Sequence, residues 1–183
     1  MVARARALMP NPLACCIWLT GLPGAGKTTI ARALAQRLAC GPRGVFVLDG
    51  DVLRQGLNRD LGFSEADRVE NIRRVAEVAR LMVDAGLIVV VALISPYRGE
   101  RAFARKLFAP GAFIEIYVNT PLEVCMQRDP KGLYARARRG QIANLTGVDG
   151  VYESPEAPDL ALDTTATDVG TCIDKLLRAT SLG

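Results

Sequence analysis

Apolar and polar positions alternate along this chain in two distinct patterns. Short, almost wholly apolar runs predict five β-strands, at residues 14–20, 45–48, 87–94, 113–118 and 159–163. The run at 87–94 is rich in β-branched residues, which is typical of a central parallel strand buried on both faces. Segments with a helical period separate the runs. This alternation predicts a single α/β domain with a mainly parallel five-stranded sheet flanked by helices.

The segments between the strands carry helix signals of their own. Residues 27–38 place their apolar side chains on one face. Ser64 and Asp67 form the pattern of a capping box at the start of a long helix, and Gly86 is placed to end that helix. Further helices are expected at 98–108, after Pro121, and over the closing amphipathic stretch from Val169 to Leu177.

Composition narrows the candidate functions. The 183 residues suit one domain, and we assign residues 1–12 to a tail and 13–183 to the domain. The chain has no histidine, which excludes Ser-His and Cys-His mechanisms. The five cysteines form no CxxC pair, and four of them lie in apolar patterns, which indicates reduced core residues in a cytoplasmic protein; these four are Cys15, Cys16, Cys125 and Cys172. No apolar run is long enough to span a membrane, and a net charge of +4 with 5% aromatic residues gives weak grounds for nucleic-acid binding.

The residues after the first predicted strand match a phosphate-binding loop. The stretch GLPGAGKT at 21–28 fits GxxxxGK[ST], and it lies between a strand and a helix as that motif requires. Lys27 is expected to reach the β- and γ-phosphates of ATP, and the Thr28 hydroxyl is expected to bind Mg²⁺. The pattern therefore predicts a P-loop NTPase fold. The predicted ATP-binding residues are Gly21, Leu22, Pro23, Gly24, Ala25, Gly26, Lys27, Thr28 and Thr29.

Two carboxylates follow the second predicted strand. Asp49 and Asp51 flank Gly50 at the edge of the sheet where the phosphate loop is expected. The DxxG and NKxD signatures of a GTPase are not in place. The pair suits a kinase instead, because carboxylates can hold Mg²⁺ or its water and orient an acceptor hydroxyl. A solvated turn rich in aspartate is the alternative interpretation.

Basic side chains are placed to receive an anionic substrate. Arg54 precedes a helix on which Arg68 and Asn71 share a face, although an arginine there can also be a solvated charge. Downstream, a stretch punctuated by glycine predicts a mobile basic lid at about 129–144, which would cover the phosphates and exclude water. The alternatives are an exposed charged loop or a nucleic-acid patch. The basic residues of this region are Arg128, Lys131, Arg136, Arg138 and Arg139.

These motifs belong to longer stretches that resemble one family. The stretches are GLPGAGKTTIARAL, LDGDVLRQGLNRDLGFSEADRVENIRRVAEVARLM, ISPYRGERAFAR, FIEIYVNTPLEVCMQRDPKGLYARARRG and TGVDGVYESPEAPDLALDT. From about Ile17 to about Leu177 the chain closely resembles adenylylsulfate kinase. The resemblance implies an enzyme that transfers the γ-phosphoryl group of ATP to the 3′-hydroxyl of adenylyl sulfate, which gives 3′-phosphoadenylyl sulfate for sulfate assimilation.

The resemblance also implies roles for single residues. Asp49 matches an acidic residue near Mg²⁺ and the reacting hydroxyl, with Asp51 in support, and Phe63 matches an aromatic residue that stacks on the acceptor adenine. Ser95 matches a serine described in some members as a phosphoserine intermediate, but direct transfer needs no covalent step, so we expect it to contact substrate. The candidate catalytic residues are Lys27, Asp49, Asp51 and Ser95, the candidate Mg²⁺ ligands are Thr28 and Asp49, and the candidate acceptor-binding residues are Arg54, Phe63, Arg68, Asn71, Ser95, Lys131 and Leu145.

Two positions depart from the pattern of this family. Leu145 stands where a phenylalanine closes the second side of the acceptor adenine, which implies a stacking loss of about 1 kcal/mol. Val151 stands where proline is usual. A kinase for another nucleotide or small hydroxyl compound therefore stays an alternative, as does a non-catalytic nucleotide-binding regulatory domain. The family further implies a homodimer with ATP and adenylyl sulfate as substrates, no nucleic-acid partner, and a functional link to ATP sulfurylase.

Overall fold

The predicted strands assemble into one sheet in which every neighbouring pair is parallel. The computed structural model describes residues 14–180 and 182. The strand order is β2-β3-β1-β4-β5. The bounds are β1 Cys16–Thr20, β2 Val45–Asp49, β3 Ile88–Ala92, β4 Phe113–Val118 and β5 Leu160–Leu162. The predicted parallel α/β sheet is confirmed, and the predicted tail at residues 1–12 lies outside the described residues.

The helices agree with the sequence pattern except at two short elements. Their bounds are α1 Lys27–Leu38, α2 Gly50–Leu53, α3 Glu65–Asp84, α4 Arg98–Lys106, α5 Leu122–Arg128, α6 Leu133–Arg138 and α7 Val169–Thr180. The capping box at Ser64 is present, with reciprocal hydrogen bonds between Ser64 and Asp67. The sequence did not predict α2 or α6. Both are short, and α6 begins after Gly132, which has a φ of 64° and offers no side-chain cap to signal a helix.

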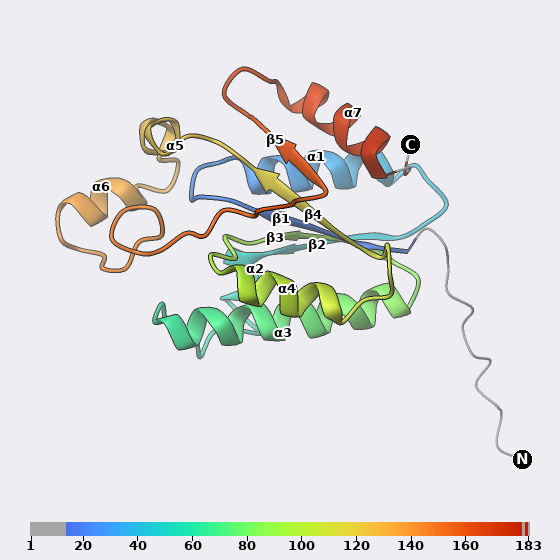
Figure 1. Ribbon diagram of the computed structural model, residues 1–183, viewed down its shortest axis with the longest axis horizontal. Helices are drawn as coiled ribbons and strands as arrows, with labels where there is room; N and C mark the ends of the chain where they lie inside the picture. The colour runs from blue at the N-terminus through green and yellow to red at the C-terminus, as the bar shows by residue number, and fades with distance from the viewer. Residues whose placement is uncertain (1–13, 181, 183) are drawn as a thin grey trace, which may run out of the picture.

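Three layers make up the fold (Figure 1). The helices α1 and α7 cover one face of the sheet, and α3 and α4 cover the other. Alternate residues of β1 face opposite layers, so this central strand is buried on both sides. Ile17 and Leu19 pack in the layer of α1 and α7, whereas Cys16 and Trp18 pack in the layer of α3. α5 and α6 lie beyond one end of the sheet.

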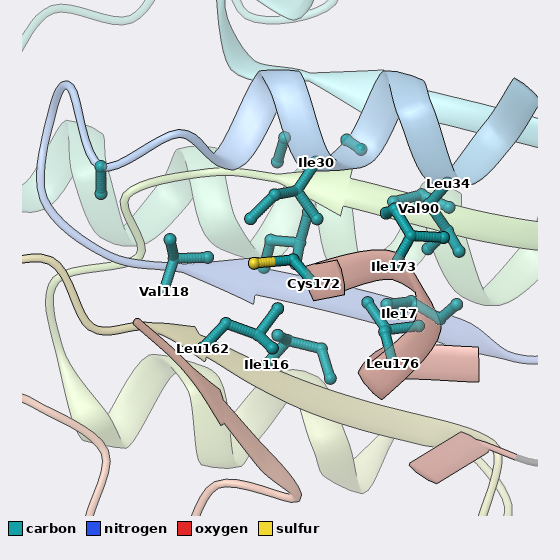
Figure 2. Packing of buried hydrophobic residues seen from close by; sticks show 14 of the residues in the cluster. Ile17, Ile30, Leu34, Val90, Ile116, Val118, Leu162, Cys172, Ile173 and Leu176 are labelled. Atoms are coloured by element: carbon teal, nitrogen blue, oxygen red, sulfur yellow. The ribbon is translucent and has the colours of Figure 1, made fainter. Parts of the chain in front are cut away.

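The core between the sheet and α1 fixes the helix that follows the phosphate loop. Figure 2 shows Ile30 and Leu34 of α1 above the strand residue Ile17, with Ile173 and Leu176 of α7 beside them. All five side chains are buried, and each contributes about 1.5–3 kcal/mol through removal from water. The start of α1 is therefore held firmly against the sheet.

The cysteines are not paired. Cys15, Cys16, Cys125 and Cys172 are buried and free, as predicted, and Cys40 is exposed just after α1. Burial raises the pKa of the Cys15 thiol to about 11, so this thiol stays protonated at neutral pH. No helix within the described residues has the length and apolar character needed to cross a membrane.

The carboxyl ends of the three strands β1, β2 and β3 lie level with one another. Ala92 of β3 pairs with Leu19 of β1 on one side and with Asp49 of β2 on the other. The phosphate loop follows β1 directly, and Ser95 follows β3 within three residues. Parallel strands thus bring these segments to one edge of the sheet, as the sequence predicted.

Candidate active site

A cavity of about 640 Å³ opens at this edge of the sheet. We call residues 21–29, of which Pro23, Gly24 and residues 26–29 line the cavity, the donor side, and the part of the wall formed by Arg54, Phe63, Arg68 and Asn71 the acceptor side. The two sides face one cavity, together with Asp49, Asp51, Ser95 and Lys131. Four predicted site residues do not line the cavity, namely Gly21, Leu22, Ala25 and Leu145.

Glycine is required in the phosphate loop because the chain passes close to its neighbours. Gly24 has a φ of 78°, and a Cβ there would lie 2.9 Å from the carbonyl oxygen of Cys125. A Cβ at Gly21 would lie 2.6 Å from the carbonyl oxygen of Val118. Ala25 is fully buried, which anchors the loop from behind. The loop is therefore shaped by backbone contacts on the side away from the cavity.

Lys27 lies inside the loop with its ammonium group against backbone oxygens. Its Nζ donates to the carbonyl oxygens of Gly21 at 2.8 Å and Leu22 at 2.7 Å. The side chain is almost completely buried, and this burial lowers the pKa of Lys27 to about 8. A bound phosphate would favour the charged form, so the ammonium group is placed to exchange carbonyl partners for phosphate oxygens.

Thr28 and Asp49 connect the loop to the end of β2. The Thr28 hydroxyl donates to Asp49 Oδ2 at 2.8 Å, and both residues line the cavity. The other carboxylate oxygen of Asp49 accepts from the Asp51 N–H at 2.9 Å and so caps α2. The predicted Mg²⁺ ligands are thus adjacent oxygen donors. They fit Mg²⁺, which binds one or two protein oxygens and keeps water and phosphate oxygens as its other ligands.

The acceptor side is built around an exposed aromatic ring. Phe63 is 60% exposed, and the guanidinium carbons of Arg54 and Arg68 lie 4.4 Å and 5.9 Å from its ring centroid. Arg54 donates to the carbonyl oxygens of Leu61 at 3.1 Å and Gly62 at 3.0 Å. The pKa of Arg54 is lowered, first by burial and second by the positive charge of Arg68. The two guanidinium groups therefore lie close together, and a bound anion would stabilise both.

Arg68 joins the acceptor side to the end of the predicted lid region. Its Nη2 donates to the carbonyl oxygen of Asn144 at 2.7 Å, and its Nε donates to that of Phe63 at 3.1 Å. Asn144 has a φ of 58°, and the loop behind it is closed by Asp149, which accepts from the N–H groups of Asn144 and Leu145. The link between residues 68 and 144 is long-range, and no sequence signal predicted it.

Leu145 lies in the core and not at the cavity. It is 6% exposed and packs in the same layer as α1. The predicted contact of Leu145 with the acceptor adenine stays a prediction, but the side chain is directed to the hydrophobic interior because the Asp149 turn holds its backbone. The exposed residue Val151, which replaces the usual proline, is absent from the cavity wall within the described chain.

Ser95 lines the cavity at the end of β3 but is only 2% exposed. Its hydroxyl accepts a hydrogen bond from the indole Nε1 of Trp18 at 2.9 Å. Its carbonyl oxygen accepts from Arg101 at 2.6 Å, and its φ is 47°, an uncommon value for a residue other than glycine. Arg101 is itself buried and pairs with Glu115 at 2.7 Å. Buried contacts therefore fix this serine from behind.

The predicted lid region carries the helix α6 and is fastened at two points besides the Arg68–Asn144 hydrogen bond. The Tyr134 hydroxyl donates to the carbonyl oxygen of Pro23 at 2.9 Å, which joins α6 to the phosphate loop. Lys131 forms an ion pair with Asp51 of α2, so the lid meets α2 across the cavity. The Asp129 carboxylate accepts from the Ala135 N–H at 2.9 Å and stabilises the start of α6. Part of the expected mobile loop is therefore ordered helix.

One wall of the cavity, which includes the corner between β5 and α7, was not predicted from the sequence. Arg128 at the end of α5 donates to the hydroxyl of Thr164 at 2.8 Å and to its carbonyl oxygen at 2.7 Å. The corner follows a strand end and is rich in Thr and Asp, a signal of a ligand loop that could have been noticed. Its lining residues are Arg128, Thr164, Thr167, Asp168, Val169 and Cys172.

Comparison with known proteins agrees with this geometry. The sequence pattern of the family described as adenylylsulphate kinase matches residues 13–163. The chain is 53% identical over 180 residues to the adenylyl-sulfate kinase of Aeromonas hydrophila, covering 98% of this chain and 90% of that protein. It is 56% identical over 173 residues to the bifunctional enzyme NodQ of Rhizobium sp. (strain N33). That match covers 94% of this chain and 27% of the relative, so the chain spans about a quarter of the NodQ length.

A solved structure with two ligands has the same fold. The APS kinase CysC of Mycobacterium tuberculosis, in complex with AMPPNP and APS, matches with a TM-score of 0.87 and 44% identity. The match covers 91% of this chain and 97% of that one. The family pattern covers most of the chain, and a relative of similar length shares more than half of its residues. The chain therefore belongs to the adenylylsulphate kinase family.

Proposed function

We propose that this protein is an adenylyl-sulfate kinase, which transfers the γ-phosphoryl group of ATP to the 3′-hydroxyl of adenylyl sulfate. One observation carries the proposal: a phosphate loop with its lysine and an arginine-rich acceptor side face the same cavity. The donor side suits the triphosphate of ATP, and the acceptor side suits a nucleotide with a second anionic group. Membership of the family supports the same reaction.

The donor triphosphate would lie against the start of α1. Backbone N–H groups of the loop and the helix N-terminus favour phosphate oxygens, and Lys27 would place its charge at the β- and γ-phosphates. The corner formed by Arg128 and Thr164 lines the same cavity, and it would offer a guanidinium plane and hydroxyl groups to the donor adenine. The loop would therefore set the orientation of the phosphorus that is attacked.

The acceptor would bind with its base on Phe63 and its phosphosulfate near the arginines. The exposed Phe63 ring offers a face for stacking on adenine, and Arg54 and Arg68 lie beside it. Asn71 adds a neutral polar group deeper in the cavity. Ser95 lies at the adjoining strand end, where its hydroxyl can contact the substrate. This arrangement discriminates in favour of a nucleotide that carries a compact anion.

Transfer would be direct and in line. The acceptor 3′-oxygen forms a bond to the γ-phosphorus while the bond to the β,γ-bridging oxygen breaks, and the hydroxyl proton passes to a carboxylate or to a phosphoryl oxygen. Asp49 is held by Thr28, and Asp51 is held by Lys131, so either carboxylate can orient the hydroxyl. When bound at Thr28 and Asp49, Mg²⁺ supplies charge neutralisation for the phosphates.

The wider context is proposed from the family. The resemblance to this family implies a functional link to ATP sulfurylase, and one relative, NodQ, is described as a bifunctional enzyme. We further propose that the protein acts as a cytoplasmic homodimer on two small-molecule substrates. Light scattering at micromolar concentration tests the dimer, and a monomeric mass would contradict it.

The experiment is ADP formation from ATP and Mg²⁺ with and without adenylyl sulfate, run beside Asp49→Ala. We expect strong stimulation by adenylyl sulfate and a loss of about a hundredfold or more in the variant, because the carboxylate acts at the reacting groups. A panel of other nucleotides and small hydroxyl compounds serves as the acceptor control. Absence of stimulation in a folded protein that binds ATP would exclude adenylyl sulfate as the acceptor, and nucleotide binding without any turnover would favour a regulatory domain.

A further inference from the structure

Behind the acceptor side lies a second asparagine, Asn58, which does not line the cavity. It belongs to the segment between α2 and α3 and is 0% exposed. Its backbone N–H donates to the carbonyl oxygen of Leu53 at 2.9 Å, and its own carbonyl oxygen accepts from the Leu61 N–H at 3.2 Å. Its side-chain Nδ2 donates to Asn71 Oδ1 at 3.0 Å. A fully buried amide thus contacts a residue of the acceptor side from behind.

This hydrogen bond decides which end of the Asn71 amide is available to a ligand. Asn71 lies on α3, is 7% exposed and lines the cavity. Because its Oδ1 is occupied by Asn58, its Nδ2 is the end left for the cavity. Among residues 14–180 no partner takes a hydrogen bond from this Nδ2. Asn71 therefore offers N–H donors to the cavity and withholds its acceptor.

The buried Asn58 side chain is not explained by stability. Its Oδ1 is buried and has no hydrogen-bond partner in the described part of the chain. An unpaired buried acceptor is unfavourable, and an apolar residue of similar size would avoid that cost. A buried polar group that destabilises the fold is often kept for a site that it serves, and the only hydrogen-bond partner of this side chain among the described residues is Asn71.

Docking of the segment onto α3 does not depend on Asn58 either. Arg74 of α3 binds both carboxylate oxygens of Asp60, at 2.7 Å and 2.8 Å. Arg74 also donates to the carbonyl oxygen of Leu57 at 3.2 Å. These contacts fasten the residues on both sides of Asn58 to α3. The hydrogen bond between Asn58 and Asn71 is therefore not needed to hold the segment on α3, and its effect is to orient the Asn71 amide.

We propose that Asn58 is a positioning residue that fixes the Asn71 amide with its Nδ2 toward the acceptor, so that Asn71 donates to the anionic phosphosulfate group. The inference rests on the proposed function, because that function supplies an anion on this side of the cavity. Donors and cations then surround the anion, with Arg54 and Arg68 as the neighbours. A reversed amide would direct an oxygen at the anion and repel it.

Two substitutions separate orientation from packing. Asn58→Asp keeps the size of the side chain, and the introduced carboxyl group can donate a hydrogen bond only when it is protonated. When protonated it can donate to Asn71 Oδ1 and keep the native orientation, whereas the carboxylate only accepts and so turns Nδ2 inward. Burial raises the pKa of the introduced carboxyl group, which brings this change into a range where the protein is folded. Asn58→Leu removes the contact and favours neither orientation.

The measurement is calorimetric binding of adenylyl sulfate without ATP, from pH 5 to pH 8, as a ratio of variant to wild-type dissociation constants. At pH 5 we expect Asn58→Asp to bind adenylyl sulfate nearly as tightly as the wild type. At pH 8 we expect it to bind about ten- to a hundredfold more weakly, which is the loss typical of a missing hydrogen bond to a charged group. Asn58→Leu should bind adenylyl sulfate a few-fold more weakly than the wild type at every pH. Asn119→Asp, at an exposed position outside the cavity wall, is the matched control and should show no pH-dependent loss.

The outcomes are distinct. Equal weakening by Asn58→Asp and Asn58→Leu at every pH, or no weakening by either, would overturn the inference. In the wild type, the side-chain NH₂ signals of Asn71 should shift on binding while those of Asn58 stay; an unshifted Asn71 signal would also overturn it, without any variant. If the protein binds adenylyl sulfate but does not phosphorylate it, the proposed function fails and the binding ratios still decide the role of Asn58. If the wild type does not bind adenylyl sulfate, both proposals fail.

Discussion

The donor side and the acceptor side face each other across one cavity, but they are held in place in different ways. The donor side is a single stretch, residues 21–29, shaped by close backbone contacts such as that of Gly24 with the carbonyl oxygen of Cys125. The acceptor side combines residues from the α2–α3 segment and from α3 itself, and one of them, Arg68, is tied to residue 144. The donor side is therefore formed by one continuous stretch of the chain, whereas the acceptor side is formed by residues from separate segments.

The most prominent side chains of the two sides differ in exposure. Lys27 is 9% exposed and hydrogen-bonded to its own loop, whereas Phe63 is 60% exposed and contacts two arginines. A phosphate loop must present N–H groups in one geometry, so it is rigid before the ligand arrives. An acceptor side that depends on side chains can change without loss of the fold. This difference explains how kinases can share a donor site and differ in the acceptor they use.

The largest expected effect is on the donor side alone. We expect Lys27→Met to lower ADP formation by about a thousandfold, because it removes a charge placed at the transferred group. The affinity for adenylyl sulfate should stay within twofold. Steady-state ADP formation and calorimetric binding give the two readouts. The control is Lys106→Met, an exposed lysine at the end of α4, and turnover by Lys27→Met within tenfold of wild type would contradict the prediction.

Next in size is the loss of the buried support behind Ser95. Glu115→Gln removes the charge that pairs with Arg101, which is 2% exposed, and leaves a buried cation without its partner. We expect unfolding in urea to lose about 3–5 kcal/mol. Glu156→Gln breaks an exposed pair with Arg98 and should cost about 0–1 kcal/mol. Equal costs for the two variants would show that the buried pair stabilises the fold no more than the exposed one.

A smaller effect is expected on the acceptor side alone. Arg54→Gln should weaken adenylyl sulfate binding by about ten- to a hundredfold, because a charged hydrogen-bond donor to the phosphosulfate is lost. ATP binding should not change. Arg59→Gln, an exposed arginine of the same segment that does not line the cavity, is the matched control. Calorimetry measures both ligands, and a parallel loss of ATP affinity would mean that the two sides are not separable.

The pH dependence of ATP binding tests the donor side in the wild-type protein, without a substitution. The pKa of Lys27 is about 8 before phosphates bind, and phosphates favour its charged form, so binding takes up a proton above that pH. Affinity should therefore fall as pH rises through 8, by about tenfold per unit of pH. Calorimetry in two buffers of different ionisation enthalpy detects the proton. Lys27→Met should lack this slope, and the same slope in both proteins would assign it to another group.

The smallest effect on binding is expected at Leu145. Leu145→Phe restores the residue that is usual in the family, but the position is buried in the core and is not on the cavity wall. We expect adenylyl sulfate binding to stay within twofold, and stability to fall by about 1–3 kcal/mol through overpacking. Calorimetry and urea unfolding measure these. An increase in affinity of more than fivefold would place this side chain at the acceptor adenine.

Much of the fold could be predicted from local pattern. The bounds of α1 and β4 follow directly from apolar period and run length, and the start of α3 from the capping box of Ser64. Two short helices were missed because four to six residues give no periodic signal, and α6 begins at a left-handed Gly132. The ends of the strands differ by up to two residues, since hydrogen bonding and not composition ends a strand.

The sequence by itself determined the sheet, the phosphate loop and the residue types of the acceptor side, because periodicity and glycine geometry act over a few neighbouring residues. Only the tertiary structure decided which distant groups meet: Thr28 with Asp49, Lys131 with Asp51, and Asn58 with Asn71. It also decided that Leu145 is a core residue. Contacts between residues far apart in the chain depend on how helices pack on the sheet, and that packing is a property of the whole fold.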